Sequence, residues 1–481
     1  MSQKSQLMKN TIIIAIGKLS TQILSYVLLP FFTARMAVEE YGTYDLGCTL
    51  SLFLCPIITL LMEESMFRFL IDAESIKEKR KVISQTIIYT IIATIIFVPL
   101  AILVFMATKK YPSSFVFAFI VFVISNILID LSNALARGLS QIKMFSISNF
   151  ILGILTLILT IVVLIVAPSA VGLLWANSIA NIFTSLLVLR KLNFKKYFGK
   201  YDKKVMKEMV NYSIPLVPNS ISWTIINMSD RIILTNFIDS AANGIYAMAN
   251  KFPNIINVLY SYFYTAWKES AAKILKQDNK TEYYNGIYHD IKRFMVAVTL
   301  CLIAVMPFAF PVFINAKYAE AYIYIPIIMI ATYYSCMSSF YGGIFSAYKD
   351  TKIMGITTFI AAMINLIIDV MFVHQFKIYA ACFSTLIADL LIYYYRRAKL
   401  REFLKLKELN MTGPVVVMLI VCFAYYTKFI PGISNTWYWI INVFSLIIAV
   451  AYSYMINKKN IKIIVNKTKA RFSKGKENQE Q

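Results

Sequence analysis

The chain has 481 residues, of which 59% are hydrophobic and only 15% are charged, and its mean hydropathy is +0.64. This composition excludes a soluble protein. The formal net charge of +23 suits either a nucleic-acid-binding protein or a membrane protein with basic loops, and the positions of the charges decide between the two.

About fourteen apolar runs are long enough to span a bilayer, since about 20 residues at ~1.5 Å rise cross a hydrocarbon core of ~30 Å. The sequence therefore predicts an all-α integral membrane protein with about 14 transmembrane helices. The first run is too long for a signal-peptide core and no small-residue cleavage site follows it, so we expect a retained first helix. The predicted spans lie near 11–33, 44–68, 84–107, 115–135, 146–167, 170–189, 211–237, 244–267, 292–314, 322–347, 354–374, 378–395, 413–430 and 437–456.

These spans divide into an N-terminal six-helix lobe over 1–207, a C-terminal six-helix lobe over 208–407, and helices 13 and 14 with a basic tail over 408–481. With an even number of spans both termini share a side, and most of the 48 Lys and Arg residues fall in the tails and connections of that side. The positive-inside rule assigns it to the cytoplasm. Topology thus explains the net charge, and we expect contacts with membrane lipids rather than with nucleic acid.

An internal repeat relates the two halves. A shift of 202 residues aligns Gly42 with Gly244 and Tyr44 with Tyr246, at the start of the second helix of each half. Each half holds an even number of spans, so the repeats keep one orientation and their axis runs along the membrane normal. A substrate site is expected between them, near the middle of the membrane.

Polar residues recur at helical spacing along several spans, so that they share one helix face. One such stripe, in the fourth predicted span, comprises Asn126, Asp130, Asn133 and Arg137. Such residues either hydrogen-bond between helices or line a cavity. For the eighth span we expect a cavity lining, because the stripe runs along the whole predicted helix: Asn243, Tyr246, Asn250, Asn254, Asn257, Ser261, Tyr264 and Lys268.

Four basic residues lie within predicted spans, where a cation costs at least ~2.5–3.5 kcal/mol and usually faces a cavity or a partner. Arg231 follows Asp230 directly, so the two side chains diverge on a helix and each needs a partner elsewhere, either a neighbouring helix or the substrate. Arg68 has Glu64 four residues earlier, which favours a local salt bridge. Neither Lys18 nor Lys251 has an acidic residue at helical spacing. The candidates for substrate binding in a central cavity are Lys18, Arg231, Lys251, Asn250, Asn254, Asn257 and Arg68.

Acidic residues within the spans are candidates for ion coupling or gating, with hydrogen-bonded structural roles as the alternative. The six cysteines form no CxxC or metal-spaced set, the two histidines are far apart, and no phosphate-binding glycine loop occurs. We therefore expect no metal, no cofactor and no catalytic residue. The acidic candidates are Asp45, Asp130, Asp230, Asp369 and Asp389.

Several short segments resemble bacterial polysaccharide flippases of the multidrug/oligosaccharidyl-lipid/polysaccharide exporter superfamily. They are the segment from Tyr212 to Pro218, the triplet Ser229-Asp230-Arg231, the segment from Asn243 to Ala247, and the turn from Glu39 to Tyr44. The resemblance covers most of the chain, including its layout of six, six and two helices.

The resemblance implies two six-helix lobes in a V shape around a central cavity. It also implies that polyprenyl-pyrophosphate-linked oligosaccharides are flipped from the inner to the outer leaflet of a bacterial cytoplasmic membrane by alternating access, for capsule or another surface polysaccharide. The expected partners are this substrate, a polysaccharide polymerase and glycosyltransferases, and we expect a monomer. Lys18 and Arg68 align with Ser220 and Ser270 in the second half, so any cationic cavity is asymmetric.

Two alternatives stay open. A cation-coupled multidrug exporter of the same superfamily predicts acidic rather than basic cavity residues. A membrane glycosyltransferase or polymerase requires a sizeable outer loop with catalytic acids, whereas every predicted outer connection has about ten residues or fewer, so we expect no enzyme. The energy source is left open between a proton, a sodium ion, the membrane potential and removal of the product.

Overall fold

The computed structural model describes residues 28–108, 111–275, 277–348, 350–402 and 404–477. Within these ranges the regular secondary structure is helical, which confirms the predicted all-α class. The chain packs as two compact units, one formed by 1–247 with 313–318 and the other by 248–312 with 319–481.

The first unit contains the helices of the N-terminal half and three that follow it. α6 packs against α8, α4 packs against α6, and α10 packs against α3. The elements are α2 (Leu29–Arg35), α3 (Val38–Thr59), α4 (Met62–Asp72), α5 (Ile76–Thr108), α6 (Ser113–Gly138), α7 (Ile142–Val166), α8 (Ala170–Lys191), η1 (Phe194–Tyr197), α9 (Lys203–Ser213), η2 (Ile214–Leu216), α10 (Val217–Phe237) and α11 (Ser240–Ala249), the last of which ends in the second unit.

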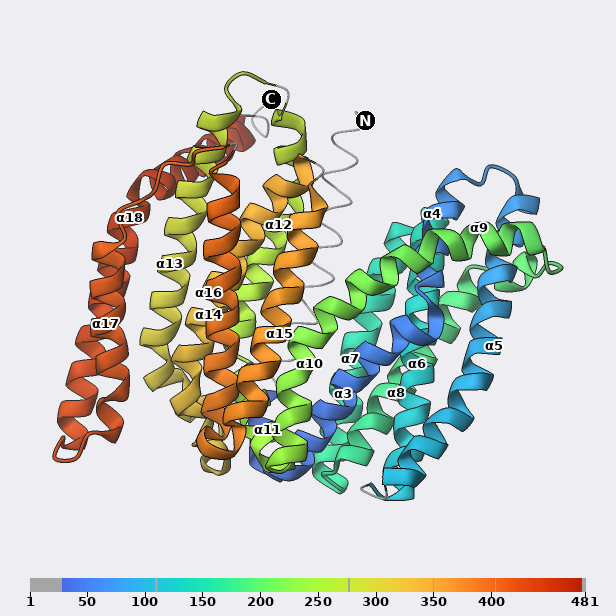
Figure 1. Ribbon diagram of the computed structural model, residues 1–481, viewed down its shortest axis with the longest axis horizontal. Coiled ribbons are helices and arrows are strands. Elements are labelled where there is room, and N and C mark those ends of the chain that lie inside the picture. Colours follow the sequence, from blue (N-terminus) through green and yellow to red (C-terminus); the bar gives the residue numbers. More distant parts are fainter. Residues whose placement is uncertain (1–27, 109–110, 276, 349, 403, 478–481) are drawn as a thin grey trace. The chain divides into compact units, whose positions relative to one another are not determined.

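In the second unit α14 is the central helix, packed against α12, α15 and α16 (Figure 1). The two last helices pack against each other. The elements are α12 (Pro253–Ile274), α13 (Lys280–Phe313), η3 (Ala316–Tyr318), which belongs to the first unit, α14 (Ala321–Ala347), α15 (Thr351–Phe376), α16 (Ile378–Leu400), α17 (Thr412–Tyr426), η4 (Thr427–Phe429) and α18 (Asn435–Glu477).

Eleven helices in the described residues are long and apolar enough to cross a membrane. Most of the first predicted span lies outside the described residues. α10 and α12, with 21 and 22 residues, are long enough but do not reach the hydropathy of the others. α10 holds Arg231 and α12 holds Asn254 and Asn257, so the polar residues that lower the hydropathy of these helices include predicted site residues.

Two spans predicted as continuous helices are broken in the structure, and both predictions are wrong. The second span breaks at Leu60 and Leu61, whose φ angles of 47° and 55° place them in the strained left-handed region. The eighth breaks between Ala249 and Pro253, where Pro253 begins α12. Proline has no N–H to donate and is favoured at the first turn of a helix, so a new helix starts there. The polar stripe of the eighth span is therefore divided between two helices.

Two glycines that the predicted 202-residue repeat aligns lie at one close helix crossing within the first unit. A Cβ added to Gly42 would overlap the carbonyl oxygen of Ser240, and a Cβ added to Gly244 would overlap the carbonyl oxygen of Val38. The 202-residue shift relates Val38 to Ser240 just as it relates Gly42 to Gly244. α3 and α11 thus touch backbone to backbone through equivalent residues, as two elements related by a pseudo-twofold axis do, and only glycine permits so close an approach.

Candidate functional site

The first unit encloses a polar cavity of about 900 Å³. The fourth-span stripe lies along one wall: Asn126, Asp130, Asn133 and Arg137 of α6 all line it. The other walls come from α3, α4, α7 and α10. The cavity therefore lies among helices of which three, α3, α6 and α7, are long and apolar enough to span a membrane.

Arg231 reaches this cavity from α10 and pairs with Asp45 of α3. Its Nε atom lies 2.7 Å from Asp45 Oδ2, and the two side chains are only 19% and 16% exposed. The neighbouring Asp230 instead accepts a hydrogen bond from the hydroxyl of Tyr246. The prediction that Asp230 and Arg231 take separate partners is confirmed. Because a half-buried guanidinium and its carboxylate cancel each other's charge, the helix pair is nearly neutral at this point.

The remaining charges of the cavity are mostly acidic. Arg137 Nη2 lies 3.3 Å from Glu64 Oε1, and its guanidinium lies 4.8 Å from the centroid of the Phe67 ring, a favourable cation–π geometry. Glu63 and Asp130 also line the cavity. Three carboxylates and two guanidiniums thus line the same space.

The asparagines of the α6 wall also join helices. Asn126 Nδ2 donates to Ser51 Oγ of α3 at 2.8 Å, and its Oδ1 accepts from Asn181 of α8 at 2.7 Å. Asn133 Oδ1 accepts from Ser148 of α7 at 3.0 Å. Cavity lining and interhelical hydrogen bonding were stated as alternatives, but these residues do both, because an amide has donors and acceptors on two sides.

Arg68 lies away from the cavity, on the exposed side of α4. It pairs with Asp72 at 2.6 Å and is 47% exposed. The local salt bridge was predicted, but its predicted partner Glu64 is wrong, because Glu64 pairs with Arg137 of α6. Lys18 lies outside the described residues, so its predicted role stays a prediction.

The second unit holds the other predicted site residues. Asn250 and Lys251 lie in the turn between α11 and α12 and are half-buried, and Asn254 and Asn257 are exposed on α12. The carbonyl of Asn250 accepts the N–H of Asn254 at 3.2 Å and so helps to start α12. Asn257 Oδ1 accepts from Cys336 Sγ at 3.6 Å. Their predicted contact with substrate stays a prediction.

The acidic candidates of the second unit lie on two adjacent helices. Asp369 is buried on α15 one turn after Asn365, which donates to Ser384 Oγ of α16 at 3.0 Å. Asp389 is half-buried on α16. Their proposed part in ion coupling stays a prediction.

Sequence reasoning missed Arg396, a buried cation of this unit. Arg396, 6% exposed, donates to Thr357 Oγ1 at 3.0 Å, to Thr358 Oγ1 at 2.9 Å, and to the carbonyls of Ser338 and Met354, both at 3.3 Å. The predicted twelfth span ended at residue 395, whereas α16 continues to Leu400. The sequence carried one signal for this site, since the adjacent threonines at 357–358 on the neighbouring span offer two hydroxyl groups to a buried cation.

Comparison with known proteins agrees with this architecture. A family model described as polysaccharide biosynthesis protein matches residues 7–267, more than half of the chain. A protein of the Lsg locus of Haemophilus influenzae is 22% identical over 282 residues, which are 54% of this chain and 67% of that protein.

Two solved structures share the fold at low sequence identity. The lipid II flippase MurJ in an inward closed conformation has a TM-score of 0.72 at 14% identity, covering 94% of this chain and 100% of that one. A multidrug resistance transporter of the MATE family, in an inward-facing conformation, has a TM-score of 0.61 at 12% identity, covering 81% and 98%.

The eleven long apolar helices of the described residues define a multi-pass membrane protein, and its fold is shared with solved members of the multidrug/oligosaccharidyl-lipid/polysaccharide exporter superfamily. The resemblance found in the sequence is thereby confirmed. The chain belongs to the polysaccharide biosynthesis protein family, and its fold is similar to that of the lipid II flippase MurJ.

Proposed function

We propose that the chain flips polyprenyl-pyrophosphate-linked oligosaccharide units from the inner to the outer leaflet of a bacterial cytoplasmic membrane, for capsule or another surface polysaccharide. The observation that carries the proposal is Arg231, a largely buried guanidinium on the wall of a polar cavity in a chain of the polysaccharide biosynthesis family. The alternating-access route, the cytoplasmic position of both termini, the monomeric state, and the partnership with glycosyltransferases and a polymerase belong to the same proposal.

The Arg231–Asp45 pair supplies a physical mechanism for reversible binding. A pyrophosphate entering the cavity competes with Asp45 for the guanidinium, which binds phosphate oxygens through strong, charge-assisted hydrogen bonds. When the anion leaves, Asp45 takes its place and no bare cation is left in the membrane. Release is therefore easier than from an unpaired arginine, which suits a protein that has to discharge its substrate in each cycle. Lys18 and Lys251 are proposed as further contacts for the anionic headgroup.

The test compares variants of the full chain reconstituted into vesicles with a fluorescent lipid-linked oligosaccharide. Arg231→Gln is expected to lower the translocation rate by roughly 10- to 100-fold, because a hydrogen bond to a charged group contributes about 1.5–3 kcal/mol. Asp45→Asn is expected to lower KM and also the turnover rate, since the guanidinium then holds the anion more tightly. Arg190→Gln, which changes an exposed residue in the last turn of α8, serves as the control and is expected to translocate at the wild-type rate.

Two results contradict the proposal. One is absence of translocation by the wild-type protein with any lipid-linked oligosaccharide. The other is a wild-type rate for a correctly folded Arg231→Gln variant. If Asp45→Asn instead lowers the turnover rate with KM unchanged, the pair holds α3 and α10 together and does not exchange with substrate.

A second candidate function has one observation in its favour. Glu63 and Asp130 give the cavity the acidic residues that a cation-coupled multidrug exporter of the same superfamily requires. This candidate predicts that a deletion strain becomes sensitive to cationic drugs while its surface polymer is unchanged. Glu63→Gln together with Asp130→Asn would then reproduce the deletion. The flippase predicts loss of the polymer in the deletion strain and no change in drug sensitivity.

A further inference from the structure

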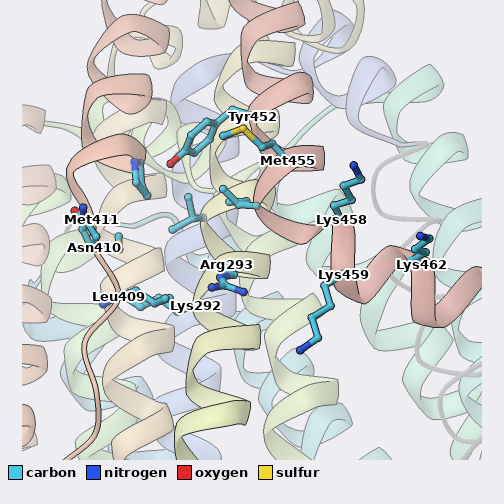
Figure 2. A pocket seen from close by; sticks show the side chains of 13 residues that line it. Lys292, Arg293, Leu409, Asn410, Met411, Tyr452, Met455, Lys458, Lys459 and Lys462 are labelled. Atoms are coloured by element: carbon cyan, nitrogen blue, oxygen red, sulfur yellow. The ribbon is translucent and has the colours of Figure 1, made fainter.

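A second cavity lies within the second unit, at the level where the sequences of α13 and α18 change between charged and apolar. Its volume is about 680 Å³, and it is lined by α13, by the connection at residues 409–411, by the start of α17 and by α18. Figure 2 shows Arg293 between the connection that carries Leu409 and Met411 and the lysines of α18. This cavity is separate from the one in the first unit.

The lining of this basic pocket carries five cations and no carboxylate: Lys292, Arg293, Lys458, Lys459 and Lys462. Lys292 is buried and is already satisfied by the hydroxyl of Tyr288 at 2.9 Å and by Glu408 at 3.4 Å. Within the described part of the chain, the other four form no ion pair with an acidic side chain. The pocket thus has a surplus of positive charge.

Two acidic residues that are close in sequence to the lining residues are already engaged. Glu408 pairs with Arg397 at 2.6 Å, in addition to Lys292. Asp290 accepts a hydrogen bond from Asn460 of α18 at 2.9 Å. Neither lines the pocket. Arg293 and the three exposed lysines of α18 can therefore pair with an external anion.

The pocket is amphipathic in a way that selects a lipid rather than a free anion. Along α18, Met455 and Ile456 precede the lysines, and along α13, Arg293 precedes Val296. Asn457 Nδ2 donates to the carbonyl of Arg293 at 3.3 Å, so the charged-to-apolar boundaries of these helices lie at one level. A ligand that fills the pocket meets cations at one end and an apolar wall at the other. A phosphate with an attached acyl chain has this distribution.

We propose that this basic pocket binds the phosphate headgroup of an anionic phospholipid, with an acyl chain along the wall formed by Val296, Met455 and Ile456. Arg293 is the central phosphate ligand, since its guanidinium offers paired donors, and the lysines of α18 add attraction near the membrane surface. The bound lipid would hold α18 against α13 and set the depth of both helices in the leaflet. This inference does not depend on the proposed flippase function.

The test uses the full-length protein, delipidated in detergent, with phosphatidylglycerol, phosphatidylcholine, polyprenyl phosphate and inorganic phosphate as separate probes. Binding is measured by native mass spectrometry and by the shift of the thermal unfolding midpoint. Phosphatidylglycerol is expected to bind and to raise the midpoint, whereas phosphatidylcholine and inorganic phosphate are not. The double variant Arg293→Gln/Lys459→Gln is expected to weaken phosphatidylglycerol binding about 25-fold, roughly fivefold for each basic residue near the surface.

Two further variants keep the result interpretable. Arg190→Gln/Lys191→Gln removes two exposed cations at the end of α8 and is expected to bind as the wild type does. Arg293→Lys keeps the charge and is expected to retain most of the affinity, which shows that the site folds. Equal phosphatidylglycerol binding by the wild type and the Arg293→Gln/Lys459→Gln variant would overturn the proposal. Binding of inorganic phosphate alone with the same affinity would overturn the lipid assignment, and so would exclusive binding of polyprenyl phosphate.

Discussion

Replacement of Gly42 by alanine tests the helix crossing on which the repeat relationship depends. The new Cβ would overlap the carbonyl oxygen of Ser240 and lie 2.7 Å from the backbone nitrogen of Gly244, whereas unstrained heavy-atom contacts lie near ~3.5 Å. α3 and α11 would have to separate by about 1 Å or more. That movement also breaks the hydrogen bond from Asn243 Nδ2 to the carbonyl of Gly42, which is 2.7 Å long and buried.

The expected loss of stability is the sum of two effects. Overpacking costs about 1–3 kcal/mol, and a buried polar group without its partner costs about 1–3 kcal/mol more. For a chain of this length the unfolding entropy is roughly 1 kcal/mol per degree, so the midpoint is expected to fall by about 2–6 °C. The assay is thermal unfolding in detergent at one fixed scan rate, because membrane proteins of this size unfold irreversibly and the midpoint depends on the rate.

Gly355→Ala is the matched control. Gly355 lies inside α15 with open space around its Cα, so alanine there is expected to stabilise the helix by ~0.5–1 kcal/mol. Gly244→Ala is expected to lower the unfolding midpoint as much as Gly42→Ala does, since the contact is symmetric. The double variant is expected to lose less stability than the sum of the two single variants. A Gly42→Ala midpoint equal to that of Gly355→Ala would refute the close crossing.

Two further outcomes follow from the packing and the charges. Trp267→Ala is expected to destabilise the second unit by about 3–5 kcal/mol, because the indole donates to the carbonyl of Phe340 at 3.0 Å and stacks on the phenyl ring of Phe340 at 4.4 Å. The control is Trp437→Ala, which changes a side chain that is 61% exposed and should change the thermal midpoint little. Equal losses of stability in the two variants would contradict the role assigned to Trp267. The hydrogen bond from Lys81 and the backbone N–H groups at the start of α9 hold the pKa of the half-buried Asp202 carboxyl below its usual range. Its contribution is therefore present above the unfolded-state pKa and is lost as the pH falls through the lower folded-state pKa. As the pH falls through this acid range, the thermal unfolding midpoint of Asp202→Asn should decline less than that of the wild type. Parallel plots of midpoint against pH for the two proteins would contradict the role of this carboxyl.

The cavity of the first unit shows how pairing changes the meaning of a buried charge. From the sequence, Arg231 was expected to face a cavity or a partner, and it does both. The partner Asp45 was itself a candidate for ion coupling, so two predicted roles meet in one ion pair. A guanidinium that is neutralised at rest and available to a competing anion fits transport better than permanent binding.

Local pattern was enough to predict the class of the protein and the positions of most helices. Apolar length, the distribution of basic residues and the motif from Glu39 to Tyr44, which forms the start of α3 and not the predicted turn, are properties of short segments and do not depend on how those segments pack. The breaks at Leu60–Leu61 and before Pro253 were missed, although Pro253 is a local signal for a helix start. The left-handed leucines carry no such signal, since nothing in their residue type favours a positive φ.

The sequence by itself determined that the chain crosses a membrane many times, that its halves are related, and that a few charged residues lie where charge is costly. Only the tertiary structure decided how those charges are satisfied. Arg231 pairs with Asp45, 186 residues away, Glu64 pairs with Arg137 rather than with its own helix neighbour Arg68, and Arg293 meets the lysines of α18 in one pocket. The physical reason is that an ion pair depends on distances of a few ångströms, which only the packing of helices far apart in the chain can set.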